Sequence, residues 1–345
     1  MPQPTVAIAL SGGMDSAVAA AQLLEAGYLV KACYMELPLK DEAEKKQQAL
    51  AMAAHLAIPL ECIDLRQDFA SLVIRYFTES YRQGLTPNPC VRCNQHIKFG
   101  LLAQAMQRSG ADVIATGHYC RIVDHASGPM LARAADPLKD QSYFLARLSR
   151  QQLQGVLFPL GNRHKSEVRL RARALDLPLP QGESQDVCFL DQGLGAFLSA
   201  QGFSAAAGDI VNTQGQRLGS HQGIWRYTIG QRRGLGLPDA SPWYVAAIDR
   251  KKNQLIVAKQ EELLQKTCTL QALHWLAGPP ELPWRGTIQL RSQHRGASGE
   301  LYPKGPDTAL LQFDSPQRAI TPGQFAVFYQ DDLVLGSAMI AASRG

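Results

Sequence analysis

A strand-like apolar run that ends in a Ser-Gly-Gly-x-Asp-Ser loop is the feature that most constrains the fold of this chain. Residues 6–10 read Val-Ala-Ile-Ala-Leu, residues 11–16 read Ser-Gly-Gly-Met-Asp-Ser, and a helical pattern follows. Glycines let successive backbone N–H groups turn inward, and the helix start presents unpaired N–H groups and its positive dipole end to the same point. An ordinary glycine turn is the alternative, but the whole pattern after a strand favours an anion-binding cradle.

The loop lacks the lysine that a Walker-type nucleotide loop needs. In that motif a Gly-Lys-Ser/Thr ending brings a cation to the terminal phosphates. No lysine directly follows Gly13, so the sequence disfavours a Walker-type phosphotransferase. The pattern instead resembles the PP-loop of ATP pyrophosphatases, which cleave ATP to AMP and pyrophosphate and commonly activate an oxygen by adenylation.

Short apolar runs alternate with helical segments up to about residue 190. The strand candidates are residues 6–10, 30–35, 60–64 and 112–116, and the helix candidates are 17–26, 42–56, 69–81 and 97–108. This alternation predicts βαβ units and a doubly wound parallel sheet, with the glycine loop at the carboxyl edge where such folds bind ligands. The stretch 150–177 is expected to continue helical.

The second half of the chain changes to short strands separated by glycine, proline and Asn/Asp turns. Strands are expected at 208–211, 223–230 and 243–248, and again near 286–291, 308–313 and 324–329 after the proline-rich stretch 278–283. A length of 345 residues suggests two or three domains. We therefore expect an α/β fold with domains at 1–200, 201–268 and 269–345, the last two being small β domains.

Charge, hydropathy and cysteine content indicate where the protein is located more clearly than which reaction it catalyses. The 35 basic and 30 acidic residues leave a net charge of +5, a mild bias that is compatible with a polyanionic partner but does not demand one. No basic, apolar leader opens the sequence and no apolar run is long enough to cross a bilayer, so we expect a cytoplasmic protein without membrane contact. In that reducing setting, cysteines in motifs are expected to be catalytic or metal-binding.

Two cysteine sites stand in motifs. Cys90 and Cys93 form a C-x-x-C pair in the Pro/Asn-rich loop 86–94, and Cys188 lies in the segment 182–190. A lone C-x-x-C fits half a zinc site, part of an iron–sulfur site or a redox pair, and the absence of a second pair weakens the zinc reading. The remaining cysteines lie in or beside apolar stretches and are expected to be small core residues; they are Cys33, Cys62, Cys120 and Cys268.

Motifs spread over essentially the whole chain carry a family resemblance. In order they are the PP-loop, Pro-Asn-Pro at 87–89 leading to Cys93-Asn94, Gly-His-Tyr at 117–119, Lys-Asp-Gln-Ser-Tyr-Phe-Leu at 139–145, Gly-Glu-Ser-Gln-Asp-Val-Cys at 182–188 and Tyr-Thr-Ile-Gly-Gln-Arg-Arg-Gly-Leu at 227–235. Together they resemble the bacterial tRNA-specific 2-thiouridylases, the MnmA family. The resemblance implies a PP-loop domain similar to adenine nucleotide alpha hydrolases, a small central β domain and a C-terminal β-barrel.

The resemblance also implies a reaction and its substrates. ATP adenylates the C2 oxygen of the wobble uridine in the tRNAs for glutamate, glutamine and lysine, and sulfur then replaces the activated oxygen. The positions that match the family's ATP site, with Mg²⁺ balancing the phosphates, are Ala9, Leu10, Ser11, Gly12, Gly13, Met14, Asp15, Ser16, Met35 and Gly117. The positions that match tRNA contacts are Asn88, Pro89, Cys90, His118, Lys139, Asp140, Gln141, Arg291, Ser292 and Gln324.

The sulfur chemistry implied by the resemblance uses two thiols. Cys188 matches the catalytic persulfide carrier, loaded by an upstream sulfur donor such as a cysteine desulfurase or a sulfur relay protein. Cys93 matches the partner thiol that resolves the intermediate, which leaves a transient disulfide between the two. Asp186 and His118 are further candidates for tuning these thiols or the leaving group.

Cys90 departs from the family pattern, because some members carry Asp at that position. The change removes an acid from the base site and supplies a third thiol. Cys90, Cys93 and Cys188 are therefore alternative ligands for a [4Fe–4S] cluster that would carry sulfide to the uridine, although we prefer the persulfide scheme.

Two other function classes compete with this interpretation. A PP-loop amide-forming ligase shares the adenylation step but needs no paired cysteines, so Cys93 and Cys188 in their motifs argue against it. A non-catalytic RNA-binding protein is disfavoured by the intact loop at 11–16.

Overall fold

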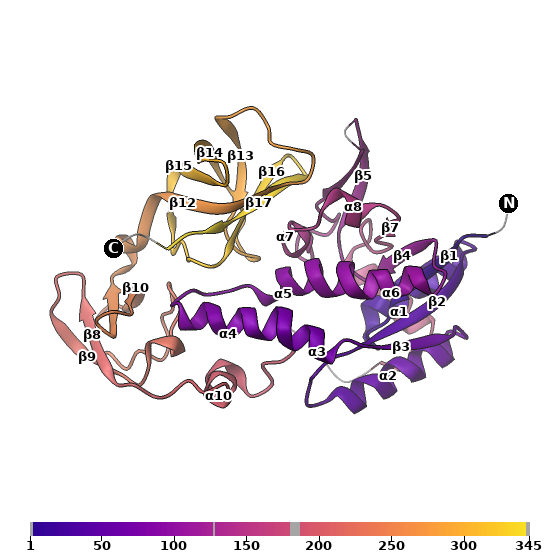
Figure 1. Ribbon diagram of the computed structural model, residues 1–345, viewed down its shortest axis with the longest axis horizontal. Helices are drawn as coiled ribbons and strands as arrows, with labels where there is room; N and C mark the ends of the chain where they lie inside the picture. The colour runs from indigo at the N-terminus through magenta and orange to yellow at the C-terminus, as the bar shows by residue number, and fades with distance from the viewer. Residues whose placement is uncertain (1–2, 127, 180–186, 343–345) are drawn as a thin grey trace.

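The computed structural model describes residues 3–126, 128–179 and 187–342, and its N-terminal unit is built on a parallel sheet (Figure 1). The strands are β1 (Thr5–Ala9), β2 (Leu29–Glu36), β3 (Leu60–Asp64), β4 (Val113–Thr116) and β7 (Val156–Leu157). Their order is β3-β2-β1-β4-β7, and every neighbouring pair is parallel. The chain winds outward from β1 through β2 to β3 and then resumes at β4 on the other side of β1. That reversal is the switch point at which such sheets bind ligands.

Helices cover both faces of this sheet. One face packs against α1 (Met14–Glu25), α2 (Glu42–His55) and α9 (Lys165–Ala174). The other packs against two composite helices with π-helical parts, α3 (Arg66–Phe69), η1 (Ala70–Ile74) and α4 (Arg75–Arg82), then α5 (Pro89–Arg92), η2 (Cys93–Leu102) and α6 (Ala103–Arg108). Alternation along β1 sends Val6 and Ile8 to the first core and Ala7 to the second.

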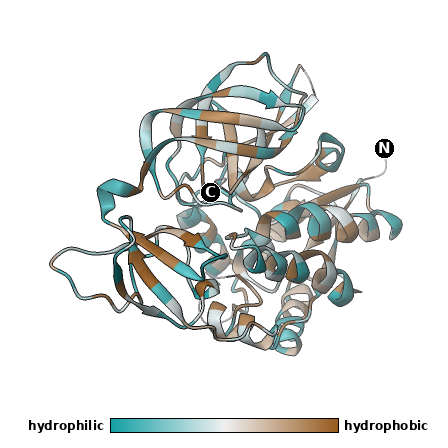
Figure 2. Ribbon diagram, turned by 60° about the vertical axis from the view of Figure 1, so that its left-hand side comes forward, coloured by the Kyte–Doolittle hydropathy of each residue, from teal (hydrophilic) through white to brown (hydrophobic). Residues whose placement is uncertain are grey.

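The apolar pattern explains this layering. The residues of the central strand β1 that face the two cores, Val6, Ala7 and Ile8, are fully buried, and Figure 2 shows hydrophobic residues concentrated on the strands while the outer helices carry hydrophilic residues. None of the described helices is long and apolar enough to cross a membrane.

Two smaller β units follow. The central unit contains β8 (Gly208–Asn212), β9 (Arg217–His221), β10 (Tyr244–Asp249) and β11 (Gln254–Ala258) in the order β10-β11-β8-β9. The short helix α10 (Gly193–Ala200) precedes this unit, and the short helix η3 (Ile224–Arg226) lies within it, between β9 and β10. The last unit contains β12 (Leu264–Trp275), β13 (Trp284–Gln289), β14 (Ala297–Gly305), β15 (Thr308–Arg318), β16 (Phe325–Gln330) and β17 (Leu333–Ile340). Pairing of β12 with both β15 and β17 closes these strands into an antiparallel barrel. The fold class predicted from the sequence is confirmed.

A hairpin from the N-terminal unit joins the barrel. Strand β6 (Gly128–Ala132), paired with β5 (Arg121–His125), meets β17 at Ala132 and Leu333. The backbone N–H of Arg133 then donates to the carbonyl of Asp332 at 2.9 Å. The barrel is therefore attached to the N-terminal unit by backbone hydrogen bonds as well as by its linker.

A buried ion pair reinforces this junction. Arg133 lies 3.6 Å from the ring centroid of Tyr329 in the barrel and 3.0 Å from the carboxylate of Asp140, whose side chain is 7% exposed. Asp140 also accepts hydrogen bonds from the backbone N–H groups of Ala134 and Ser142. The Asp140 carboxylate thus holds together the segment that faces the barrel.

The structure corrects two expectations. The stretch 150–177 is not continuously helical: α8 (Arg150–Leu153) ends before Gly155, which has a φ of +67°, and strand β7 follows. The stretch 223–230 is not a strand, because Gly223 and Gly230 take φ values of +137° and +85° that bend the chain around the short helix η3.

Asp140→Ala is expected to lower the free energy of unfolding by about 3 kcal/mol, because removing one partner leaves the half-buried Arg133 uncompensated and two backbone donors unpaired. Asp209→Ala is the control, since Asp209 pairs with Arg217 at an exposed site and such pairs contribute at most about 1 kcal/mol. Denaturant titration of both variants measures the difference. Equal losses would show that the Asp140 network does not stabilise the junction.

Candidate active site at the carboxyl edge of the parallel sheet

The loop at residues 11–16 turns tightly between β1 and α1. Gly12 has a φ of +78°, and a Cβ at this position would lie 2.9 Å from the backbone nitrogen of Ala49 in α2. Only glycine accommodates both the left-handed conformation and this contact. The loop is therefore pressed against α2 with its backbone exposed to the sheet edge.

The loop's serines hold its shape. Ser16 Oγ donates to the carbonyl of Gly13 at 3.0 Å and accepts from the backbone N–H of Ser11 at 3.2 Å. Among the described residues no side chain caps the start of α1, where Gly13 is the N-cap. The first N–H groups of α1 therefore carry no side-chain cap, and binding of an anion there stays a prediction.

Gly117 brings β4 against the loop. A Cβ on Gly117 would lie 2.8 Å from the backbone nitrogen of Ser16, so this close approach requires glycine. Ala9 pairs with Cys33 of β2 and with Thr116 of β4, and Met35 lies two residues further along β2. The sequence-predicted ATP residues thus gather at one edge, and their contact with ATP stays a prediction.

Sequence reasoning missed Lys165, the first residue of α9. Its Nζ lies 2.7 and 2.9 Å from the two carboxylate oxygens of Asp15, and its side chain is 8% exposed. The hydroxyl of Tyr119 donates to the same carboxylate at 2.8 Å. A cation therefore stands beside the cradle although the loop has none. The missing Walker lysine was the available signal that a cation had to come from elsewhere.

The C-x-x-C pair starts a helix. Asn88 Oδ1 accepts from the backbone N–H of Val91 at 3.3 Å and so caps α5, which continues into η2 at Cys93. Cys90 and Cys93 are partly buried, and Cys188 is exposed. The pKa of Cys93 is raised to about 12, mainly by burial and to a smaller extent by the negative charges of Cys188 and Cys90. The structure thus brings the three predicted thiols within electrostatic reach of one another.

Lys98 faces this group of thiols. Its positive charge lowers the pKa of Cys90, Cys93 and Cys188, although burial raises the pKa of each of them more strongly. In an α-helix residues five apart point about 140° away from each other, but η2 is π-helical, and its wider turns with i→i+5 hydrogen bonds bring Lys98 nearer to the face that carries Cys93. Sequence reasoning did not single out Lys98, because an α-helical pattern places it on a different face.

The described residues around these thiols do not form a metal site. Within residues 3–126, 128–179 and 187–342, no group of three or more His, Cys, Asp or Glu side chains is arranged to hold a metal ion. Asp186 and the preceding motif residues from 182 onward lie outside the described residues.

His118 links the cradle to the thiols. It follows Gly117, is buried, and places Nδ1 2.6 Å from the Thr116 hydroxyl. Its ring packs 5.9 Å from that of Phe99 in η2, the neighbour of Lys98. Burial and then the charge of Lys98 hold the pKa of His118 well below its usual range, so the ring is neutral. Its predicted tRNA contact stays a prediction, made from a buried position.

The other predicted tRNA residues fall into two groups. Near the C-x-x-C loop, Gln324 Nε2 donates to the carbonyl of Thr86 at 2.8 Å, which holds the loop with Asn88 and Pro89 against the barrel. In the second group, the side chains of Asp140 and Gln141 accept hydrogen bonds from backbone N–H groups: Asp140 from that of Ala134, and Gln141 Oε1 from that of Tyr119 at 2.9 Å. Lys139 is partly buried, and Arg291 and Ser292 are exposed after β13.

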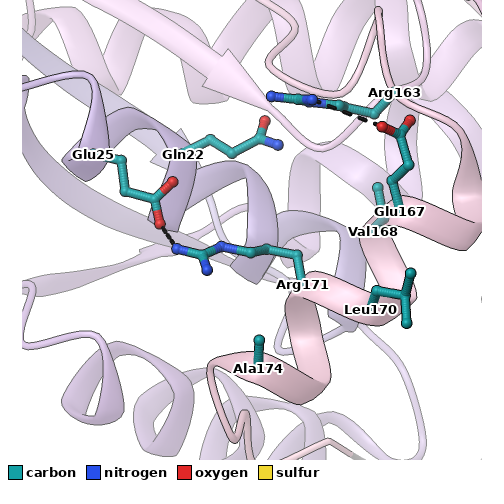
Figure 3. A pocket seen from close by; sticks show the side chains of 8 residues that line it. All are labelled: Gln22, Glu25, Arg163, Glu167, Val168, Leu170, Arg171 and Ala174. Atoms are coloured by element: carbon teal, nitrogen blue, oxygen red, sulfur yellow. Dashed lines mark hydrogen bonds and ion pairs between the residues drawn. The ribbon is translucent and has the colours of Figure 1, made fainter.

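A surface pocket of about 400 Å³ between α1 and α9 lies away from this chemistry (Figure 3). It is lined by Gln22, Glu25 and Arg171, among others, and contains the ion pair between Glu25 and Arg171. Glu25 ends α1, about 16 Å along the helix axis from the loop. The pocket is therefore not the anion cradle.

Comparison with known proteins agrees with this site. Three family models match consecutive segments, described as a tRNA methyl transferase HUP domain over residues 4–192, a tRNA methyl transferase PRC-barrel domain over 196–259 and an aminomethyltransferase beta-barrel domain over 265–340. A tRNA-specific 2-thiouridylase MnmA from Desulfotalea psychrophila is 45% identical over 337 residues, which cover 96% of this chain and 98% of the relative. Another from Syntrophotalea carbinolica is 44% identical over 346 residues, covering 97% and 98%. These family models and nearly full-length relatives show that this chain belongs to the family of the tRNA-specific 2-thiouridylases MnmA.

Proposed function

We propose that this chain is a tRNA-uridine 2-sulfurtransferase that uses ATP to adenylate the C2 oxygen of the wobble uridine and replaces that oxygen with sulfur from a cysteine persulfide. Thiolation of tRNA uridine is the activity of its family, and the names of its relatives state it. One observation supports the proposal most directly. Gly117 touches Ser16 of the loop, and the next residue, His118, packs on Phe99 of the thiol-bearing helix. Two adjacent residues therefore connect the ATP cradle with the sulfur site.

The cradle acts on the phosphates of ATP. The uridine oxygen attacks the α-phosphorus, the bond to the β-phosphate oxygen breaks, and pyrophosphate leaves. Backbone N–H groups at the start of α1 and the ammonium of Lys165 stabilise the negative charge that develops on the departing group. Lys165 in this role supplies the cation that the loop itself lacks.

Mg²⁺ fits this site as a partner of the phosphates. The ion commonly binds one or two carboxylates, substrate phosphates and waters. Asp15 is the carboxylate at the loop, and it retains acceptor positions beyond those used by Lys165 and Tyr119. When bound, Mg²⁺ neutralises phosphate charge, while Lys165 fixes the orientation of the Asp15 carboxylate.

The thiols perform the second half-reaction. The terminal sulfur of a persulfide on Cys188 attacks C2 of the activated uridine, and AMP leaves with the former C2 oxygen. The thiolate of Cys93 then attacks the Cys188 sulfur, the S–S bond to the uridine sulfur breaks, and 2-thiouridine and a Cys93–Cys188 disulfide remain. An external thiol reductant supplies two electrons to restore the cysteines, and an upstream sulfur donor reloads Cys188.

The competing functions explain less of the site. A PP-loop amide ligase leaves the grouping of Cys93, Cys188 and Lys98 without a task. A [4Fe–4S] mechanism on Cys90, Cys93 and Cys188 remains the second candidate, favoured by the third thiol at Cys90. The tRNAs for glutamate, glutamine and lysine are the proposed acceptors.

Lys165→Met is expected to reduce ATP-to-AMP turnover in the presence of tRNA by roughly a hundredfold, the usual cost of removing one group that stabilises developing charge. Lys165→Arg keeps the charge and should recover part of the rate. Release of pyrophosphate measures both, with Lys31→Met, on β2, as the control. A normal rate in Lys165→Met would remove Lys165 from the ATP site.

Cys188→Ser and Cys90→Ala separate the two sulfur mechanisms. Cys188→Ser should bind ATP and tRNA normally and form no 2-thiouridine. With a persulfide donor present, Cys90→Ala should retain most of the thiolation measured by mass spectrometry of tRNA, and Cys268→Ala, in the barrel, serves as the control. If instead anaerobically reconstituted wild-type protein holds iron and Cys90→Ala loses both iron and activity, the cluster mechanism is correct.

Alkylation should report the role of Lys98. Because burial raises the pKa of Cys93 to about 12, its thiolate fraction, and so its rate of reaction with iodoacetamide, rises about tenfold per pH unit between pH 7 and 9. Lys98→Met removes a charge that lowers this pKa, so the rate should fall at each pH. Cys268, whose pKa burial alone raises to about 12, should not respond. An equal change at Cys268 would exclude a local effect of Lys98.

A further inference from the structure

Three basic side chains gather where the helices of the N-terminal unit face the barrel. Arg92 ends α5, His96 lies one turn further in η2, and Arg147 follows α7 (Ser142–Leu145). All three are partly buried. Within the described part of the chain, none of them forms an ion pair with a carboxylate. We call these three residues the basic cluster.

The members of the basic cluster oppose one another. After burial, the charges of Arg92 and Arg147 further lower the pKa of His96, and the charge of Arg92 lowers the pKa of Arg147. The exposed Asp307 and, to a smaller extent, Tyr76 act in the other direction and raise the pKa of Arg147. The cluster therefore carries a local excess of positive charge.

Aromatic rings and a carbonyl group hold these cations in place. The guanidinium of Arg92 lies 5.0 Å from the ring centroid of Tyr76. That of Arg147 lies 5.8 Å from the ring of Phe325 and donates to the carbonyl of Ala272 in β12 at 2.6 Å. Such contacts orient an arginine without neutralising it. The arrangement keeps the charges available to a ligand.

Two polar atoms of the cluster have no partner. Arg92 Nε and His96 Nε2 are buried and form no hydrogen bond. A buried unsatisfied polar group costs roughly 1–3 kcal/mol, and more when it is charged. A neighbouring anion would offset that cost by attracting the guanidinium and favouring the protonated imidazole.

The cluster borders the residues expected to contact RNA. Tyr143 donates through its hydroxyl to the carbonyl of Phe325 at 3.0 Å. Burial raises the pKa of Tyr143 and the charge of Tyr76 adds to the increase, whereas the charge of Arg291 and a hydrogen bond with Asn88 lower it. Arg92 lies between Cys90 and Cys93 in the sequence, so the cluster and these two thiols are carried by the same helix, α5 continuing into η2.

We infer that Arg92, His96 and Arg147 form a subsite for one backbone phosphate of the RNA substrate, beside the uridine to be modified. This inference rests on the proposed function. An arginine fork matches a phosphate geometrically, and a fixed phosphate next to a splayed-out base sets how far that base enters the site. The subsite contributes position and affinity, while the thiols and the cradle contribute chemistry.

The test is the salt dependence of tRNA binding by the full chain. Arg92→Gln should reduce the slope of log Kobs against log salt by about one, as expected for the loss of one phosphate contact. Arg92→Lys keeps the charge and should keep most of the slope. Arg171→Gln, whose parent residue pairs with Glu25 at the distant pocket, is the control and should leave the slope unchanged. An unchanged slope in Arg92→Gln overturns the inference.

A change in the RNA instead of the protein provides a second test of the inference. Replacing either phosphate that flanks the target uridine with a neutral methylphosphonate should weaken binding of an anticodon stem-loop to the wild-type protein. The same replacement should have no further effect on Arg92→Gln. If neither position matters, the phosphate assignment is wrong.

Two further outcomes separate this inference from its premise. If inorganic phosphate stabilises the wild type but not Arg92→Gln against thermal unfolding while the tRNA slope is unchanged, the cluster takes a free anion and the RNA assignment fails. If the wild type neither binds tRNA nor forms 2-thiouridine, the proposed function itself fails. A wild type that thiolates tRNA together with an unchanged slope in Arg92→Gln overturns the subsite alone.

Discussion

The close approach of Gly117 to the first turn of α1 is the contact on which the site depends. With a would-be Cβ only 2.8 Å from the Ser16 nitrogen, the end of β4 can meet the loop only as bare backbone. That contact fixes how closely the end of β4 approaches α1 at the switch point. It therefore also fixes the position of His118, the next residue, and of η2, whose Phe99 packs on the His118 ring. In the proposed function adenylation and sulfur transfer are different reactions, and this backbone-to-backbone contact connects the two sites at which they take place.

Local signals made most of the fold predictable. The strands β1 to β4 and the PP-loop follow from apolar periodicity and glycine placement within a few residues. The errors have equally local causes: β7 has two residues and carries no period of its own, and glycines with positive φ interrupt the apolar run at 223–230. The β5–β6 hairpin escaped notice because its partner, β17, lies some two hundred residues later in the chain.

The site was predictable only where a motif carries it. Asp15 belongs to the loop and was predicted with it, whereas Lys165 is 150 residues away and nothing in the sequence around it marks it. The convergence of Cys93 and Cys188 came from the family resemblance, since spacing along the chain says nothing about distance in space. Lys98 and the basic cluster depend on helix geometry and tertiary packing, and a sequence read alone does not resolve a π-helical turn from an α-helical one.

The β5–β6 hairpin, which reaches from the N-terminal unit to the barrel, holds these two units at a fixed distance from each other. Strand β6 meets the barrel wall at β17, and the buried pair of Arg133 and Asp140 stiffens the chain that leaves it. In the proposed function, a tRNA that contacts the barrel is therefore held at a fixed distance from the loop at 11–16. The enzyme can then discriminate among RNAs by the distance between the region bound to the barrel and the nucleotide to be modified. An RNA with the right bases but the wrong overall dimensions would not place its uridine at the site.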